Sequence, residues 1–159
     1  MGSSLPTRPR GLAVSVAASG LGGEGGTQVM TLDIHVEWDG GAARSTSERA
    51  LDRLLDELHA YAQATEPFVV EVCSENGEVL GIGLGDSETI LLWSPAALEQ
   101  PQLSSRGTGS GTGTATFRLS GRPVEYRADQ LISIASGRAA VRHFSRTGRL
   151  SHAIEWQEA

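Results

Sequence analysis

The chain has 159 residues, of which 39% are hydrophobic and 20% are charged, and this composition is typical of one soluble globular domain. All 13 basic residues are arginine, which excludes a lysine-dependent P-loop or Schiff-base mechanism. The single cysteine, Cys73, excludes an internal disulfide and fits a reducing cytoplasm, and no apolar run approaches the ~20 residues that a membrane span needs.

Charge is distributed unevenly along the sequence. Residues 45–100 carry 11 acidic side chains and 2 arginines, a net charge of −9, whereas residues 101–159 carry 4 acids and 8 arginines, a net charge of +4. An acidic surface repels nucleic acid and attracts basic proteins, so a basic protein partner is favoured over direct nucleic-acid binding. The alternative interpretation is a merely solvated acidic face.

The N-terminal segment, residues 1–28, is rich in glycine, serine, alanine and proline and includes the glycine-rich run 20–26. Such a segment buries too little apolar surface to offset its ordering entropy. We therefore expect a disordered extension over residues 1–28 and a single folded domain over residues 29–159.

The first expected elements are a strand and an amphipathic helix. Residues 31–38 alternate apolar and polar side chains, the period of a half-buried strand. Ser45 and Glu48 have capping-box spacing, which predicts a helix from there to about Gln63. Its apolar face contains four leucines and is completed by Tyr61 or Ala62.

A three-stranded meander is expected next. Residues 68–74 and 79–84 read as strands joined by an Asn-Gly turn, and a second turn at 85–87 leads into a strand at 89–93. Glycine alternates with apolar residues along 80–85, which leaves one face of the middle strand as bare backbone. A helix, a bulge or a partner can approach such a face closely.

The last third predicts an irregular stretch at 94–102, a flexible loop at 104–113, and a hairpin from strands at 114–119 and 123–127. A helix follows at about 133–147, capped by Ser133 and stopped by Gly148, before a closing strand. The order of elements indicates the α+β class. We expect a single antiparallel sheet of about six to seven strands, with two main helices packed on one face.

Residues that could support catalysis or metal binding lack the required spacing. The four histidines and Cys73 do not form a zinc pattern, and Ser87 and Ser94 lack the glycines of a nucleophile elbow. The acidic turns lack the dense oxygen spacing of a calcium loop. We therefore assign no catalytic residue, no metal ligand and no cofactor, and do not expect an enzyme.

The C-terminal third nevertheless resembles a known family. Its characteristic pieces occur in order: Leu131-Ile132, Ala139-Ala140 with Phe144, Thr147-Gly148-Arg149, and Ile154-Glu155-Trp156. This ordered set is similar to the end of the first immunity-protein family of bacterial polymorphic toxin systems, and the likeness extends over roughly residues 30–158. The chain departs from the pattern in its long Gly/Thr loop at 107–113 and at Ser133-Ile134, where many members have proline.

The resemblance implies a small cytoplasmic α+β protein, monomeric when free, that binds and neutralises a cognate toxin without catalysis. Such toxins are often nucleic-acid deaminases or nucleases, whose basic groove an acidic surface would occlude. The matching positions expected to form the structural core are Leu131, Ala140, Phe144, Gly148, Ile154 and Trp156.

Toxin contacts are expected on the acidic meander turns, at Glu75, Glu78, Asp86 and Glu88, and on the loop at 107–113. The competing interpretation is that these turns are only solvated strand ends. Two other functions remain open: a non-catalytic structural or interaction module, and a small-ligand-binding protein that uses the glycine-rich meander as its pocket.

Overall fold

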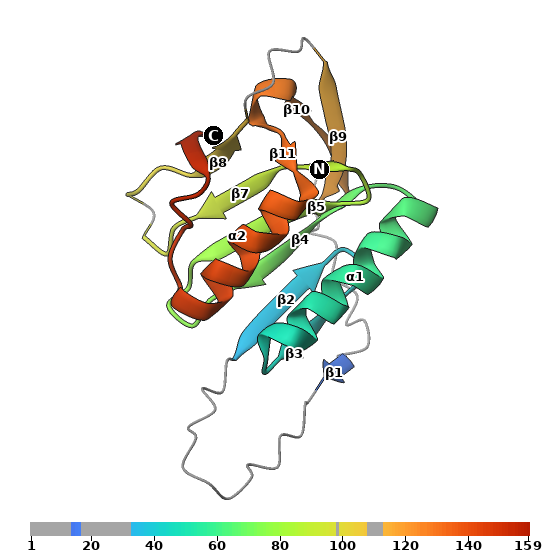
Figure 1. Cartoon of the computed structure of the whole chain (residues 1–159), viewed down its shortest axis with the longest axis vertical. Helices are drawn as coiled ribbons and strands as arrows, with labels where there is room; N and C mark the ends of the chain where they lie inside the picture. Colours follow the sequence, from blue (N-terminus) through green and yellow to red (C-terminus); the bar gives the residue numbers. More distant parts are fainter. Residues whose placement is uncertain (1–13, 17–32, 98, 108–112) are drawn as a thin grey trace, which may run out of the picture.

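The computed structural model describes residues 14–16, 33–97, 99–107 and 113–159. Figure 1 shows two helices side by side on one face of a twisted sheet. The elements, in chain order, are β1 (Val14–Val16), β2 (Ile34–Trp38), β3 (Gly41–Ser45), α1 (Glu48–Ala64), β4 (Phe68–Cys73), β5 (Val79–Leu84), β6 (Glu88–Thr89), β7 (Leu91–Ser94), β8 (Leu103–Arg106), β9 (Thr114–Leu119), β10 (Arg122–Arg127), the 3-10 turn η1 (Ala128–Gln130), β11 (Ile132–Ser133), α2 (Ile134–Thr147) and β12 (Glu155–Glu158).

The main sheet has ten strands in the order β1-β3-β2-β4-β5-β7-β8-β12, with the β9–β10 hairpin joined to β4. Its pairings are antiparallel except β1 with β3 and β4 with β9. The α+β class with two helices is confirmed, but the expected six to seven strands are too few. The extra strands are short, and β3 and β8 lack the apolar alternation that marks a strand in sequence.

The sequence also misplaced two boundaries. Residues 104–106 belong to β8 and not to the predicted loop, whose central residues 108–112 lie outside the described part of the chain. Ser47, not Ser45, caps α1, and its hydroxyl accepts a hydrogen bond from the Ala50 amide at 3.1 Å. The reason is that β3 continues to Ser45, so the helix begins later and Glu48 is its first residue.

The main core lies between the helices and the sheet. Four leucines of α1 pack with Ala140, Val141 and Phe144 of α2 against the apolar face of β4 and β5. Ala62, rather than Tyr61, completes the α1 face: Ala62 is 1% exposed and Tyr61 is 60% exposed. The caps predicted for α2 are confirmed, because Ser133 accepts from the Ser136 amide and Gly148 has φ +69°.

A second cluster covers the opposite face of the sheet. It contains Phe117 and Tyr126 from the β9–β10 hairpin with Val69, Ile90 and Leu131. The bare backbone predicted along the middle strand is the reason the hairpin fits. A Cβ atom at Gly83 would lie 2.7 Å from the Phe117 ring, so only glycine admits the ring there.

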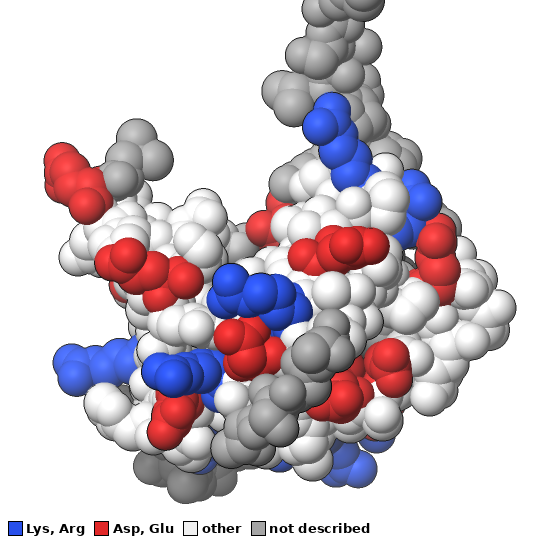
Figure 2. Space-filling model, turned by 90° about the horizontal axis from the view of Figure 1, so that it is seen from above, with Lys and Arg blue, Asp and Glu red and all other residues white. Residues whose placement is uncertain are grey.

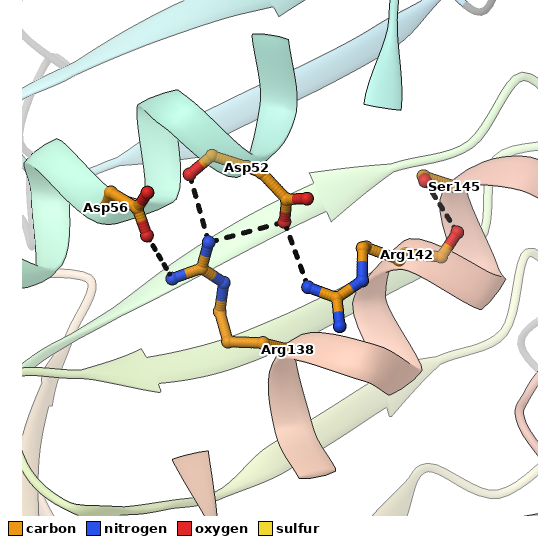
Figure 3. Close-up of polar contacts among 5 residues, drawn as sticks. All are labelled: Asp52, Asp56, Arg138, Arg142 and Ser145. Carbon is orange, nitrogen blue, oxygen red and sulfur yellow. Dashed lines mark hydrogen bonds and ion pairs between the residues drawn. The ribbon is translucent and has the colours of Figure 1, made fainter. Parts of the chain in front are cut away.

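Polar contacts join the facing sides of the two helices (Figure 3). Arg138 of α2, whose side chain is only 14% exposed, donates from Nη2 to the carbonyl and the carboxylate of Asp52, and its Nη1 lies 2.9 Å from Asp56 Oδ1. Arg142, one turn later, reaches the same Asp52 Oδ1 at 3.2 Å. One guanidinium thus bridges two successive turns of α1.

Replacement of Phe144 by alanine tests the assignment of this residue to the core. Its side chain is 1% exposed, so we expect Phe144→Ala to lower the free energy of unfolding by about 3 to 5 kcal/mol. Urea denaturation followed by circular dichroism measures the change. Near-wild-type stability would contradict the core assignment.

Removal of the Arg138 guanidinium group should weaken the contact between α1 and α2. We expect Arg138→Ala to lower the free energy of unfolding by about 2 kcal/mol, because it leaves Asp52 with Arg142 alone. Arg138→Lys should recover only part of the loss, because an ammonium group cannot make the two-pronged contact. The matched control is Arg149→Ala, an exposed arginine, and equal losses in both variants would contradict the bridge.

Candidate functional site

The four acidic residues predicted to bind a partner do not form one cluster. Glu75 and Glu78 lie in the turn before β5, and Asp86 and Glu88 lie at the turn after it. Since β5 has six residues, the two turns are separated by about 20 Å along the strand direction. The structure therefore offers two acidic turns at opposite ends of the meander.

The turn between β4 and β5 is held by its own backbone. Ser74 N–H donates to the Glu78 carbonyl at 2.9 Å, and Gly77 N–H donates to the Ser74 carbonyl at 3.1 Å. Gly77 has φ +88°, whereas Asn76 does not have a positive φ, so the Asn-Gly pair does not form a type I′ turn. In this loop Glu75 is exposed and Glu78 is partly exposed.

A hollow of about 320 Å³ adjoins this first turn. It lies between the turn, the beginning of β2 and the C-terminal end of α2, and both Glu75 and Arg146 line it. Asp33 on its wall is already paired with Arg44 at 2.7 Å. Acidic and basic groups thus meet around this hollow, which gives it no strong preference for one sign of charge.

The turn between β5 and β6 is fixed by both helices. Gly85 N–H donates to His59 Nδ1 of α1 at 3.0 Å, and Ile134 N–H at the start of α2 donates to the Ser87 carbonyl at 3.0 Å. A Cβ at Gly85, where φ is +111°, would lie 2.9 Å from Ala62 Cβ, so the turn packs tightly on α1. Asp86 and Glu88 are exposed on this rigid support.

Sequence reasoning found that the histidines lack the spacing of a zinc site, but it did not predict this role for His59. Its partner is 26 residues away in the sequence, and nothing in the local spacing indicates that contact. The hydrogen bond requires His59 to carry no proton on Nδ1. His59 thus supports the turn. Among the described residues, no group of three or more His, Cys, Asp or Glu side chains is placed to hold a metal ion.

The acidic middle of the sequence is partly neutralised by the basic last third. Asp52 and Asp56 pair with Arg138 and Arg142, and Glu66 pairs with Arg118 at 3.2 Å. Figure 2 shows acidic and basic side chains interspersed on the face seen from the top of Figure 1. Segregation of charge along the sequence therefore does not become a uniform acidic face there.

The carboxylates left without an ion pair include the predicted ones. Within the ranges that the structure describes, no arginine or histidine forms an ion pair with Glu75, Glu78, Asp86 or Glu88. Among the described groups, Asp86 accepts only from the backbone and hydroxyl of its neighbour Ser87. The negative charge of both turns thus remains available to a partner.

An aromatic hollow, which the sequence did not reveal, lies at the same end of the sheet as Asp86. Trp38, Tyr61 and Phe68 line a space of about 260 Å³. The only signal in the sequence was the ambiguity at the edge of the α1 face, where Tyr61 competed with Ala62. Helical spacing could not decide which of the two neighbours faces water.

The glycine-rich meander does not form a large pocket. The Phe117 ring occupies the space over Gly83, and Gly81 lines a hollow of only about 130 Å³ beside Trp93. Sites for small molecules commonly measure about 300 to 1,000 Å³. The structure thus gives little support to a ligand site at this face.

The motif residues of the C-terminal third are distributed over both cores. Ala140, Phe144 and Ile154 are buried in the main core, whereas Leu131 belongs to the second cluster on the other face. Trp156 is half-buried in β12 and its indole N–H donates to the Ser151 carbonyl at 3.1 Å. Gly148, with its left-handed φ, ends α2.

Comparison with known proteins gives a family match. The profile of the family described as Immunity protein Imm1 matches residues 39–158. This match covers both helices, both acidic turns and the aromatic hollow except Trp38. The curated proteins contain no match to the chain. No helix among the described residues is long and apolar enough to cross a membrane.

Proposed function

Because the chain belongs to the Imm1 family of immunity proteins, we propose that it binds a cognate bacterial toxin and neutralises it by occlusion. The observation that carries this proposal is the family match over residues 39–158. An immunity protein acts by tight and specific association, which needs a few well-placed anchors rather than a catalytic centre.

The proposed target is a toxin that acts on nucleic acid, a deaminase or a nuclease. Such an enzyme needs a basic groove to hold the phosphate backbone. The unpaired carboxylates of the two acidic turns complement a groove of that charge, and electrostatic attraction of this kind speeds association and disfavours wrong partners.

The turn at Asp86 and Glu88 is the better-supported contact. It is held by His59 of α1 and by the first amide of α2, so little ordering entropy is lost when a partner binds it. A standard interface of about 800 Å² per partner is roughly 30 Å across, wide enough to include the turn at Glu75 and Glu78 as well. Both turns therefore belong to the proposed binding surface.

Co-expression tests the function itself. The chain is expressed with the toxin encoded beside its gene, and we expect cell growth to be rescued and a complex to elute from a sizing column. Growth arrest together with the absence of a complex would overturn the proposal. Self-association of the chain, without any dependence on the toxin, would favour a structural module instead.

Neutralisation of each acidic turn tests the surface. We expect Asp86→Asn with Glu88→Gln to weaken toxin binding about 10-fold, mainly through the association rate, and we expect the loss to shrink at high salt. Asparagine keeps an acceptor oxygen for the Ser87 amide, so the turn stays intact. Surface plasmon resonance provides both rates.

Two further variants complete that experiment. Glu75→Gln with Glu78→Gln reports on the other turn, and Glu125→Gln, an exposed acid on β10, is the matched control with an expected change below about 2-fold. Wild-type association rates in both double variants would remove the acidic turns from the interface.

A further inference from the structure

Tyr61 has an unusual position for a large side chain. Among the large hydrophobic residues that the structure describes, Tyr61 is the exposed one, with a relative solvent exposure of 60%. Its ring makes a T-shaped contact with Phe68, with centroids 6.1 Å apart and planes at 68°, and this contact restricts the motion of the Tyr61 ring. Aromatic residues fixed in this way are favoured as anchors of protein interfaces.

Polar groups complete the hollow beside this ring. Arg118 is engaged by Glu66 Oε1 at 3.2 Å and by the Gly121 carbonyl at 3.0 Å, so its charge is balanced. Asp39 accepts only the Gly121 amide, at 2.8 Å, and forms no ion pair with a described residue. The hollow therefore combines three aromatic rings with one unbalanced carboxylate.

The chemistry of this lining selects a cation. Faces of tyrosine and tryptophan attract a guanidinium or ammonium group, and a nearby carboxylate adds to that attraction. The volume of about 260 Å³ is below the usual range for a small-molecule site but admits one long side chain. Charge complementarity thus favours a basic side chain from a protein.

We infer that this hollow receives an arginine or lysine side chain of the toxin's basic groove, with Tyr61 as the aromatic anchor. The inference rests on the proposed function and specifies one contact within it. The location of the hollow supports this inference. Gly85, at the base of the acidic turn, packs on Ala62 and Pro67. The neighbours of these two residues in the sequence, Tyr61 and Glu66, line the hollow, so the hollow lies close to the acidic turn. Figure 1 shows the C-terminal end of α1 on the same side of the molecule as β9.

Substitution of Tyr61 tests the anchor. We expect Tyr61→Ser to weaken toxin binding about 30-fold and Tyr61→Phe to change it less than about 3-fold, because phenylalanine keeps the ring. Arg53→Ala, at another exposed position of α1, is the matched control and should bind as the wild type does. Thermal unfolding of each variant verifies that the fold is retained, as expected for an exposed residue.

The identity of the occupant is tested by double-mutant cycles. Each arginine and lysine of the toxin's groove is changed to alanine and combined with Tyr61→Ser. We expect one toxin position whose loss is no longer additive with Tyr61→Ser but remains additive with Arg53→Ala. Strict additivity at every basic position would overturn the inference of a basic occupant.

The outcomes separate this inference from the proposed function. If the toxin binds and Tyr61→Ser retains wild-type affinity, the hollow is not a contact, although the immunity function stands. If the wild-type chain does not bind the toxin at all, both the function and the inference are overturned. Loss of affinity in Tyr61→Ser, with coupling to one basic residue of the toxin, supports both.

Discussion

The arginine bridge between α1 and α2 is the constraint on which the positions of the two helices and of the β5–β6 turn depend. Arg138 is almost removed from solvent, yet its guanidinium contacts two carboxylates and a main-chain carbonyl of α1. The β5–β6 turn is attached to α1 through His59 and to α2 through Ile134. The relative position of the helices therefore sets the position of the acidic turn as well as the closure of the core.

The same bridge changes the meaning of the charge distribution. A sequence with an acidic middle and a basic end suggests an acidic surface, but several of those acids form ion pairs with arginines from the end of the chain. The acids without an ion pair include those on the two turns, and the aromatic hollow lies at the same end of the sheet as one of these turns. Specific recognition by an immunity protein is better served by such discrete contacts than by a diffuse field, because charge alone does not distinguish one basic groove from another.

Sequence reasoning predicted the elements that have strong local patterns. The amphipathic faces of both helices, the Ser133 and Gly148 caps and the α+β class could be predicted because spacing and capping chemistry are local. It failed where tertiary contacts decide. The strand β3 has no apolar alternation and displaced the predicted cap at Ser45, and the exposure of Tyr61 depends on how α1 is rotated against the sheet. By contrast, the separation of the two acidic turns could be predicted, because the strand expected at 79–84 lies between them.

The close contact between Gly83 and the Phe117 ring limits how the recognition surface of such a protein can vary. Families that must match many different partners vary at their contact residues, and the contact residues proposed here are on turns and on one exposed ring. The Phe117 ring seated on Gly83 anchors the hairpin that carries Arg118 into the wall of the hollow. A side chain at position 83 would push the Phe117 ring away from the sheet. The hairpin would move with the ring and would shift Arg118 in the wall of the hollow, without a change in any proposed contact residue. A buried glycine thus restricts which recognition surfaces this scaffold can evolve.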